Sequence, residues 1–148
     1  MSDYNVNICK KAVPIWLSGK ENEVNTCLEL KCIAPQDKKS VLRLGGASFY
    51  QVFYDGVLVH FGPARKAHGY SAIDELAVPQ DVTEILIRAM GYNCPTFNGV
   101  FQSSFTIAEL EADGEVLAST GNSGFEYFEN LKHIQKTVRY SFPVMMRP

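Results

Sequence analysis

Apolar and polar residues alternate with a period of two along most of this chain, which is the pattern of half-buried β-strands. Residues 24–32 show it clearly, because every second position forms one mostly apolar face: Val24, Thr26, Leu28, Leu30 and Cys32. Residues 40–44 and 82–90 repeat the pattern. In residues 82–90, the expected inner face is Thr83, Ile85, Ile87 and Ala89. We expect a polar turn at residues 35–39, and we expect Gly45-Gly46 to end the second strand.

Asp55-Gly56 interrupts a run of aromatic and β-branched residues and predicts a hairpin, because a type I′ turn needs positive φ at both central residues. A two-residue loop pairs Tyr54 with Val57 and, four residues further along the ribbon, Tyr50 with Phe61. One side of this ribbon is then apolar apart from two phenol groups: Tyr50, Val52, Tyr54, Val57, Val59 and Phe61. We expect this face to fill the core.

A second Asp-Gly pair predicts another hairpin, which joins residues 105–112 to residues 115–118. Between the two hairpins we expect long loops at residues 62–79 and 91–99. The first of these loops contains one expected helical turn, at residues 71–76.

Several short strands with frequent turns predict an all-β fold, a two-layer antiparallel β-sandwich with jelly-roll or galactose-binding-domain-like connectivity. We expect one domain over residues 1–148, with its core in about residues 12–122 and a C-terminal segment at residues 123–148. In that segment, residues 125–136 permit either an amphipathic helix or an extended chain, since apolar residues recur every third position: Phe125, Phe128, Leu131 and Ile134.

The composition is that of a globular domain, with 46% hydrophobic and 20% charged residues in 148. A formal net charge of −2 gives no electrostatic reason to expect nucleic acid or an anionic membrane as a partner. No apolar run approaches the ~18 residues of a transmembrane helix. The first residues lack the features of a signal peptide, so we expect a cytoplasmic protein, or an extracellular or periplasmic one if a signal was removed.

The four cysteines, Cys9, Cys27, Cys32 and Cys94, form no CxxC pair, and the three histidines lack metal-ligand spacing. We therefore expect no metal and no other cofactor. Cys27 and Cys32 fall on opposite faces of one strand because their separation is odd, so they cannot bridge each other. Reduced, buried thiols are the expected state.

No nucleotide-binding, GxSxG or HExxH motif is present. Glycoside hydrolysis requires two carboxylates that face one sugar. Glu109 and Glu111 share a strand face, which we interpret as a solvated edge, and Asp74-Glu75 as a loop pair of no special geometry. We interpret His60 as a structural, hydrogen-bonded residue. The sequence predicts no catalytic constellation.

Carbohydrate binding is a more plausible activity, because sugars are recognised by aromatic faces, planar amides and charged groups. The expected loops and the start of the chain carry such side chains: Arg65, His68, Tyr70, Tyr92, Asn93, Asn98 and Trp16. The alternative is loop anchoring for the loop residues and core or interface packing for Trp16.

The order of several short motifs is distinctive: residues 12–17 (AVPIWL), the hairpin at residues 50–59 (YQVFYDGVLV) and residues 62–65 (GPAR). This order resembles the N-terminal β-sandwich of bacterial α-L-rhamnosidases of glycoside hydrolase family 78. Asp55 stands where that family more often has Asn. Residues 125–128 and 139–142 are similar to later segments of the same domain.

The resemblance implies that catalytic carboxylates belong to a later (α/α)6-barrel domain, so no catalytic residue carries over to this chain. It predicts a non-catalytic module that supports the packing of the parent hydrolase's other domains and binds rhamnose-containing glycans. Residues 123–148 would lead towards the catalytic domain. The alternative is a stand-alone lectin-like module. A complete small enzyme is disfavoured because acid and base partners are missing.

Overall fold

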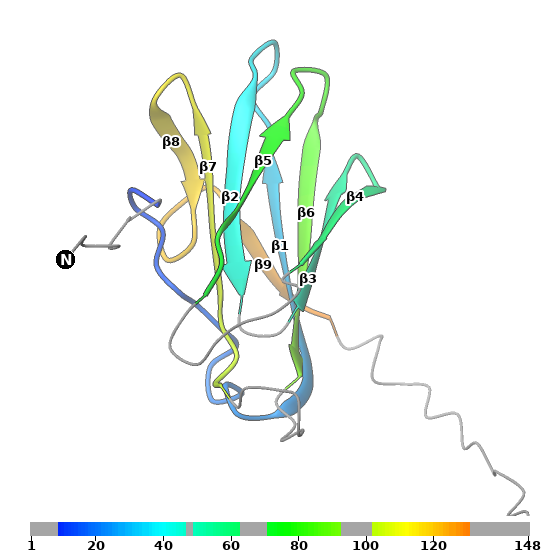
Figure 1. Cartoon of the computed structure of the whole chain (residues 1–148), viewed down its shortest axis with the longest axis vertical. Coiled ribbons are helices and arrows are strands. Elements are labelled where there is room, and N and C mark those ends of the chain that lie inside the picture. The colour runs from blue at the N-terminus through cyan, green and yellow to red at the C-terminus, as the bar shows by residue number, and fades with distance from the viewer. Residues whose placement is uncertain (1–8, 47–48, 63–70, 93–101, 131–148) are drawn as a thin grey trace, which may run out of the picture.

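The computed structural model describes residues 9–46, 49–62, 71–92 and 102–130, and in these ranges the chain forms strands and no helix (Figure 1). The strands are β1 (Val24–Ile33), β2 (Ser40–Gly46), β3 (Phe49–Tyr54), β4 (Val57–Gly62), β5 (Asp74–Val78), β6 (Glu84–Tyr92), β7 (Thr106–Ala112), β8 (Glu115–Ser119) and β9 (Glu126–Glu129). Within the same ranges, no helix is long and apolar enough to cross a membrane.

The strands form two antiparallel sheets, which confirms the predicted all-β sandwich. One sheet has five strands in the order β4-β3-β6-β1-β9, and the other has four in the order β5-β2-β7-β8. Figure 1 shows the two sheets as adjacent layers, and the chain passes repeatedly from one to the other. The division of the chain into a core and a C-terminal segment stays a prediction.

The core lies between the two sheets and consists of every second residue of the inner strands. Fully or almost fully buried side chains come from both layers: Leu28, Leu30, Leu42, Leu44, Tyr50, Val52, Ile85, Ile87 and Leu110. The inner face predicted for residues 82–90 is confirmed at Ile85, Ile87 and Ala89, whereas Thr83 precedes β6 and is exposed. Val24 is also exposed, because the register of β1 shifts between Val24 and Thr26, where Asn25 has φ 61.

Both Asp-Gly turns form as predicted. Asp55 and Gly56 have φ values of 48 and 81, and the second turn has values of 51 and 77. Asp55 has a further role, because its carboxylate accepts hydrogen bonds from the backbone N–H groups of Thr83 (3.1 Å to Oδ2) and Glu84 (2.8 Å to Oδ1). These bonds tie the hairpin turn to the start of β6.

The predicted register of the first hairpin is correct only next to the turn. Tyr54 faces Val57 and Phe53 faces Leu58, but a β-bulge then inserts one extra residue into β4. Beyond the bulge, the pairs are Val52 with His60, Gln51 with Phe61 and Tyr50 with Gly62.

The predicted apolar core face is therefore wrong for β4. Tyr50, Val52 and Tyr54 on β3 are buried, but Val57, Val59 and Phe61 are 65%, 46% and 58% exposed. Beyond the bulge the two faces of the strand are exchanged, so that His60 points inward and Phe61 outward. Val57 precedes the bulge and pairs with buried Tyr54 as predicted, yet it is exposed. β4 is also the terminal strand of its sheet, and no described neighbour covers its free edge.

Two further expectations are corrected, and an alternative that the sequence left open is settled for residues 126–129. β2 continues through Gly45-Gly46, where the chain before β5 comes so close that a Cβ on Gly45 would lie 2.8 Å from the carbonyl oxygen of Ala72. The expected helical turn at residues 71–76 is instead occupied by β5, which pairs with β2. Residues 126–129 are extended and pair with β1, while residues 131–136 lie outside the described residues.

Cys9, Cys27 and Cys32 are free thiols, and Cys94 lies outside the described residues. The prediction that Cys27 and Cys32 do not bridge each other is confirmed. Burial raises the pKa of Cys27 to about 11 and that of Cys32 to about 12. Both thiols are therefore protonated at neutral pH and behave as small apolar side chains.

Candidate functional site

Most of the predicted carbohydrate-binding residues lie outside the described part of the chain. This applies to Arg65, His68, Tyr70, Asn93 and Asn98. Tyr92 is the last residue of β6 and pairs with Val24 through its backbone, but its side chain is not among those described. The role of these side chains in sugar binding therefore stays a prediction.

Trp16 packs against the hydrophobic core. Its Nε1 donates a hydrogen bond to Oγ1 of Thr26 at 3.2 Å, and the indole leaves no room for a side chain at Gly91, whose added Cβ would lie 2.7 Å from Cζ2. This geometry agrees with core packing, which the sequence analysis gave as the alternative role of Trp16. A sugar contact by Trp16 stays a prediction.

Glu109 is fully buried, so the expected solvated edge is wrong. Its carboxylate accepts hydrogen bonds from the backbone N–H groups of Lys10 (2.9 Å), Lys11 (2.7 Å) and Ala12 (3.0 Å). Burial alone would raise its pKa, but the three backbone bonds and the nearby Arg43 guanidinium hold the pKa of Glu109 below its usual value. The N-terminal segment covers the outer face of the four-stranded sheet at this point.

Glu111 belongs to an ion-pair network on the same face. It pairs with Lys10 at 2.8 Å and with Arg43 at 3.0 Å, and Arg43 also binds Glu75 at 2.9 Å. The hydrogen bonds from Lys10 and Arg43 hold the pKa of Glu111 below its usual value. A general acid of a glycosidase has a raised pKa, whereas Glu109 and Glu111 are held as acceptors of structural hydrogen bonds and ion pairs.

A second polar cluster joins the two sheets at the end of β4. Asp74 accepts hydrogen bonds from the phenol of Tyr50 and from Nε2 of His60, the latter at 2.9 Å. Burial would raise the pKa of Asp74, but these two bonds hold it below its usual value. Burial and the bond to Asp74 raise the pKa of Tyr50.

The interpretation of Asp74 as a loop residue of no special geometry is therefore wrong, because Asp74 begins β5 and binds Tyr50 and His60. The predicted structural role of His60 is confirmed. Gly62 makes room for the cluster, since a Cβ there would lie 2.7 Å from the Asp74 carboxylate. Tyr50 is fully buried, so its phenol cannot meet a substrate. We interpret the cluster as a clip between the layers.

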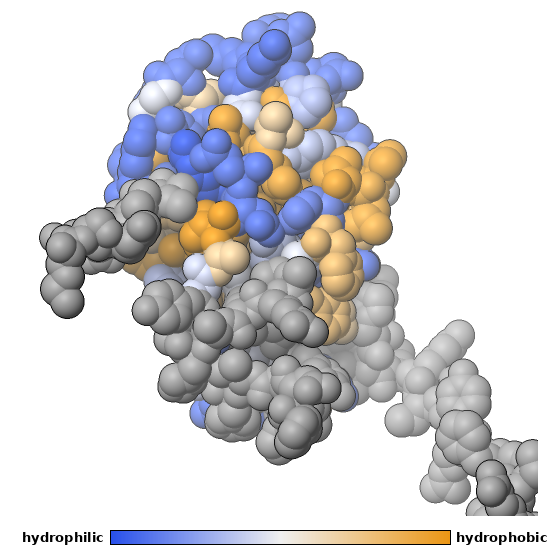
Figure 2. Space-filling view, in the orientation of Figure 1, coloured by the Kyte–Doolittle hydropathy of each residue, from blue (hydrophilic) through white to orange (hydrophobic). Residues whose placement is uncertain are grey.

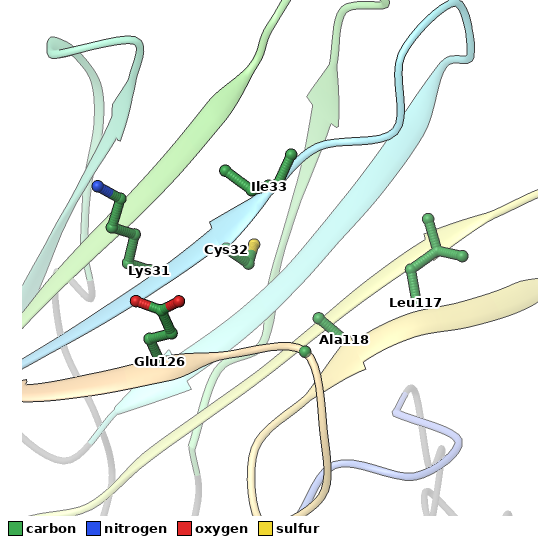
Figure 3. A pocket seen from close by; sticks show the side chains of 7 residues that line it. Lys31, Cys32, Ile33, Leu117, Ala118 and Glu126 are labelled. Carbon is green, nitrogen blue, oxygen red and sulfur yellow. The ribbon is translucent and has the colours of Figure 1, made fainter.

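One small cavity of about 210 Å³ lies between β1 and the β8–β9 connection. Figure 3 shows Lys31 and Glu126 beside each other at one end and Leu117 at the other. Lys31 is also paired with Glu84 at 2.7 Å. The volume is below the roughly 300–1,000 Å³ of typical ligand pockets. Among the described residues, no group of three potential metal ligands gathers here or elsewhere.

The outer face of the five-stranded sheet has the most distinctive surface chemistry. Strand pairing aligns two rows across it. The first row is Phe61, Gln51, Arg88, Glu29 and Phe128. The second row is Leu58, Phe53, Leu86, Lys31 and Glu126. The face therefore has apolar side chains on β4 and charged side chains on β1, with Gln51 beside Phe53 on β3 and Phe128 near Glu126 on β9.

We call the exposed apolar residues of β4 the β4 patch: Val57, Leu58, Val59 and Phe61. Figure 2 shows apolar residues gathered at the right-hand side of the view, where Figure 1 places β4. The ring of Phe61 stacks on that of Phe49 with centroids 5.7 Å apart, so the apolar surface continues onto β3. Leu58 and Phe61 share the outer face with Phe53 and Phe49, whereas Val57, which pairs with Tyr54, belongs to the other face of the strand.

Sequence reasoning missed the β4 patch and the buried Glu109. The patch had one signal in the sequence, because residues 57–61 (VLVHF) contain no charged residue, whereas residues 24–32 and 82–90 alternate apolar residues with polar and charged ones. Glu109 had a weaker one, since it lies mid-strand beside Leu110 and not at the turn. Neither signal shows that residues 10–12 cover Glu109, or that the side chains of β4 stay exposed.

No family model matches the chain, and no curated protein sequence matches it. Among solved structures, the fold is similar to the crystal structure of a GH78 family rhamnosidase of Bacillus sp. GL1, with a TM-score of 0.66 and 23% sequence identity. The match covers 81% of this chain and 13% of that rhamnosidase chain. At this level of identity the likeness defines the class of the protein, an antiparallel β-sandwich domain. The chain thus spans a small part of the protein that it resembles in fold.

Proposed function

We propose that this chain is a non-catalytic β-sandwich module of a larger, α-L-rhamnosidase-like glycoside hydrolase. The observation that carries the proposal is the unequal coverage of the fold match, which includes 81% of this chain but only 13% of the rhamnosidase. The order of the AVPIWL, YQVFYDGVLV and GPAR motifs supports the same parent protein. In this proposal the module supports the packing of neighbouring domains.

The state of the described carboxylates supports a non-catalytic role. Glu109, Glu111 and Asp74 each accept hydrogen bonds or ion pairs, and each has a pKa below its usual value. Glycoside hydrolysis needs one carboxylic acid that stays protonated near neutral pH, which requires a raised pKa. These three carboxylates are therefore built as structural acceptors and not as proton donors.

A stand-alone lectin-like module is the second candidate. It is favoured by the first row on the outer face, where the aromatic rings of Phe61 and Phe128 flank an amide, a guanidinium and a carboxylate. These are the group types that bind sugar C–H faces and hydroxyls. Rhamnose-containing glycans are the ligands proposed for it.

The test compares the 148-residue chain with the product of the complete open reading frame that contains it. We expect the longer protein to hydrolyse a chromogenic α-L-rhamnoside and the 148-residue chain to be inactive. Turnover by the 148-residue chain, or a reading frame that ends at Pro148, would refute the proposal. In the second case, NMR titration with L-rhamnose and rhamnosyl oligosaccharides at millimolar concentration tests the lectin-like candidate, and the absence of chemical-shift changes would exclude it.

A further inference from the structure

We propose that the β4 patch is a docking surface for an apolar, uncharged face of another domain of the same polypeptide. This inference rests on the proposed function, because it requires a longer chain. It assigns the domain-packing role to one edge of the sandwich. The four residues of the patch are between 46% and 65% exposed, and they occupy four of the first five positions of a single strand.

The exposure of the β4 patch is costly for a domain that works alone. Apolar surface in water is unfavourable by roughly 25 cal/mol per Å² relative to burial. Edge strands of isolated domains are usually protected by lysine, proline or inward-pointing charges. β4 has no lysine or proline, and its titratable residue, His60, is bonded to Asp74 on the other sheet. Its bulge protects the backbone edge but leaves the apolar side chains exposed. The strand therefore has the character of an interface.

The bulge in β4 determines how a partner binds. An extra residue at Val59 breaks the regular ladder and twists the edge, which disfavours the addition of another strand. The same bulge turns Phe61 outward beside Phe49. Contact is therefore made by side chains and not by extension of the sheet.

The charge distribution identifies the chemistry of the partner. β3 and β4 contain no Asp, Glu, Lys or Arg. Among the described residues of the outer face, the cation aligned with β3 is Arg88, which is paired with Glu29 at 2.7 Å and lies over the ring of Phe53 at 5.2 Å. Over these described strands, a charged partner group would lose its hydration without gaining a new ion pair, which is unfavourable. The patch therefore selects an uncharged apolar surface.

Two features favour a domain of the same chain over a separate molecule. The similar rhamnosidase fold is 13% of its chain, so most of that polypeptide is outside the sandwich. Covalent linkage also gives a neighbouring domain a high effective concentration, on the order of millimolar for short linkers, so that an interface of modest size is occupied. The patch itself is preformed, since the His60–Asp74 bond fixes β4 and the Phe49 ring supports Phe61. Docking then orders few side chains.

The experiment measures thiol accessibility at the patch in two proteins, the 148-residue chain and the full product of the reading frame. Phe61→Cys introduces the probe on β4, and Leu58→Cys is a second position in case the first variant misfolds. Leu117→Cys is the matched control, an exposed aliphatic residue (40%) on β8, the edge strand of the other sheet. Maleimide labelling is followed by mass spectrometry of the peptide that carries the introduced cysteine. In the full protein we expect labelling at position 61 to slow by roughly tenfold or more and labelling at position 117 to be unchanged.

The outcomes separate the two proposals. If the reading frame continues and position 61 labels equally fast in both proteins, the docking surface is refuted while the proposed function stands. Equal protection at positions 61 and 117 also refutes the assignment to β4. If the reading frame ends at Pro148, the proposed function and the intramolecular partner are both refuted. Protection of position 61 that appears only on dimerisation, measured by sedimentation, or only with rhamnosyl oligosaccharide, would replace the partner by a second copy or a glycan.

Discussion

Glu109 offers the sharpest test of how this sandwich is held together. We expect Glu109→Gln to lower the free energy of unfolding by about 2–4 kcal/mol at pH 7. The carboxylate accepts one backbone N–H at Oε1 and two at Oε2, from three consecutive residues. A glutamine amide that keeps its oxygen at the Oε2 position loses the bond to Lys10 and turns an N–H group towards that donor. A hydrogen bond to a charged group contributes roughly 1.5–3 kcal/mol, and the two remaining bonds lose their charge assistance.

The pH dependence gives an independent check of the same interaction. The pKa of Glu109 in the folded state is below its usual value, which is near 4.3 in the unfolded chain. A carboxylate of this kind stabilises the folded state above the unfolded pKa, and the contribution is lost as pH falls through the folded pKa. The difference in stability between the wild type and Glu109→Gln is therefore expected to be largest above about pH 5 and to narrow below about pH 4.

The assay is urea unfolding, followed by circular dichroism and by the fluorescence of Trp16, the only tryptophan of the chain. Native-state digestion with trypsin reports directly on the hydrogen bonds between Glu109 and residues 10–12, because release of the N-terminal segment exposes the peptide bonds after Lys10 and Lys11. Glu115→Gln, an exposed change on β8, is the matched control and is expected to stay within about 0.5 kcal/mol of the wild type. A loss of unfolding free energy below about 0.5 kcal/mol for Glu109→Gln, with unchanged trypsin cleavage, would refute the stabilising role of the Glu109 hydrogen bonds.

Three further predictions test the core, the interlayer clip and the thiols. Val52→Ala is expected to cost about 2–3 kcal/mol and Val59→Ala less than about 0.5 kcal/mol in urea unfolding, because only the first side chain is buried; equal losses would contradict the bulge. Tyr50→Phe removes the bond to Asp74 and is expected to cost about 1.5–3 kcal/mol, measured by thermal unfolding, and an unchanged midpoint would exclude the clip. Cys32, with its pKa raised to about 12, is expected to resist alkylation at pH 8 until urea unfolds the chain, and rapid labelling of the native protein would contradict its burial.

Local sequence determines the parts of this fold that could be predicted. The turns at Asp55-Gly56 and Asp113-Gly114 depend on positive φ values that only a few residue types adopt easily, so two letters are enough to locate them. The inner faces of β1 and β6 follow from alternation, which fails at Val24, where Asn25 shifts the register of β1, and at Thr83, which precedes β6 and is exposed. These features involve neighbours in sequence, and the sandwich class follows from their number and spacing.

The features that were missed depend on residues far apart in the chain. The bulge in β4 brings His60 to Asp74, which lies on a strand of the other sheet, and the alternation of β4 contains no sign of that partner. Glu109 is buried by backbone groups of residues 10–12, almost a hundred positions earlier. A charged residue on a strand is expected to be exposed to solvent unless the segment that covers it is known. The candidate carbohydrate-binding residues stay predictions for a different reason, since most of them lie outside the described residues.

Within the described residues, the two outer faces of the sandwich differ in how they are covered, and this difference supports the proposed docking surface. On the four-stranded sheet, the chain covers its own face: Glu109 binds residues 10–12, Val13 donates its N–H to the carbonyl of Thr120, and Ile15 bridges to Thr106. On the five-stranded sheet, the β4 patch has no comparable cover within the described ranges, although its side chains are the more apolar. A chain that used the N-terminal segment only to shield apolar surface would place it over β4. The segment instead satisfies a buried carboxylate on the opposite sheet, which is consistent with the proposal that another domain covers the β4 patch.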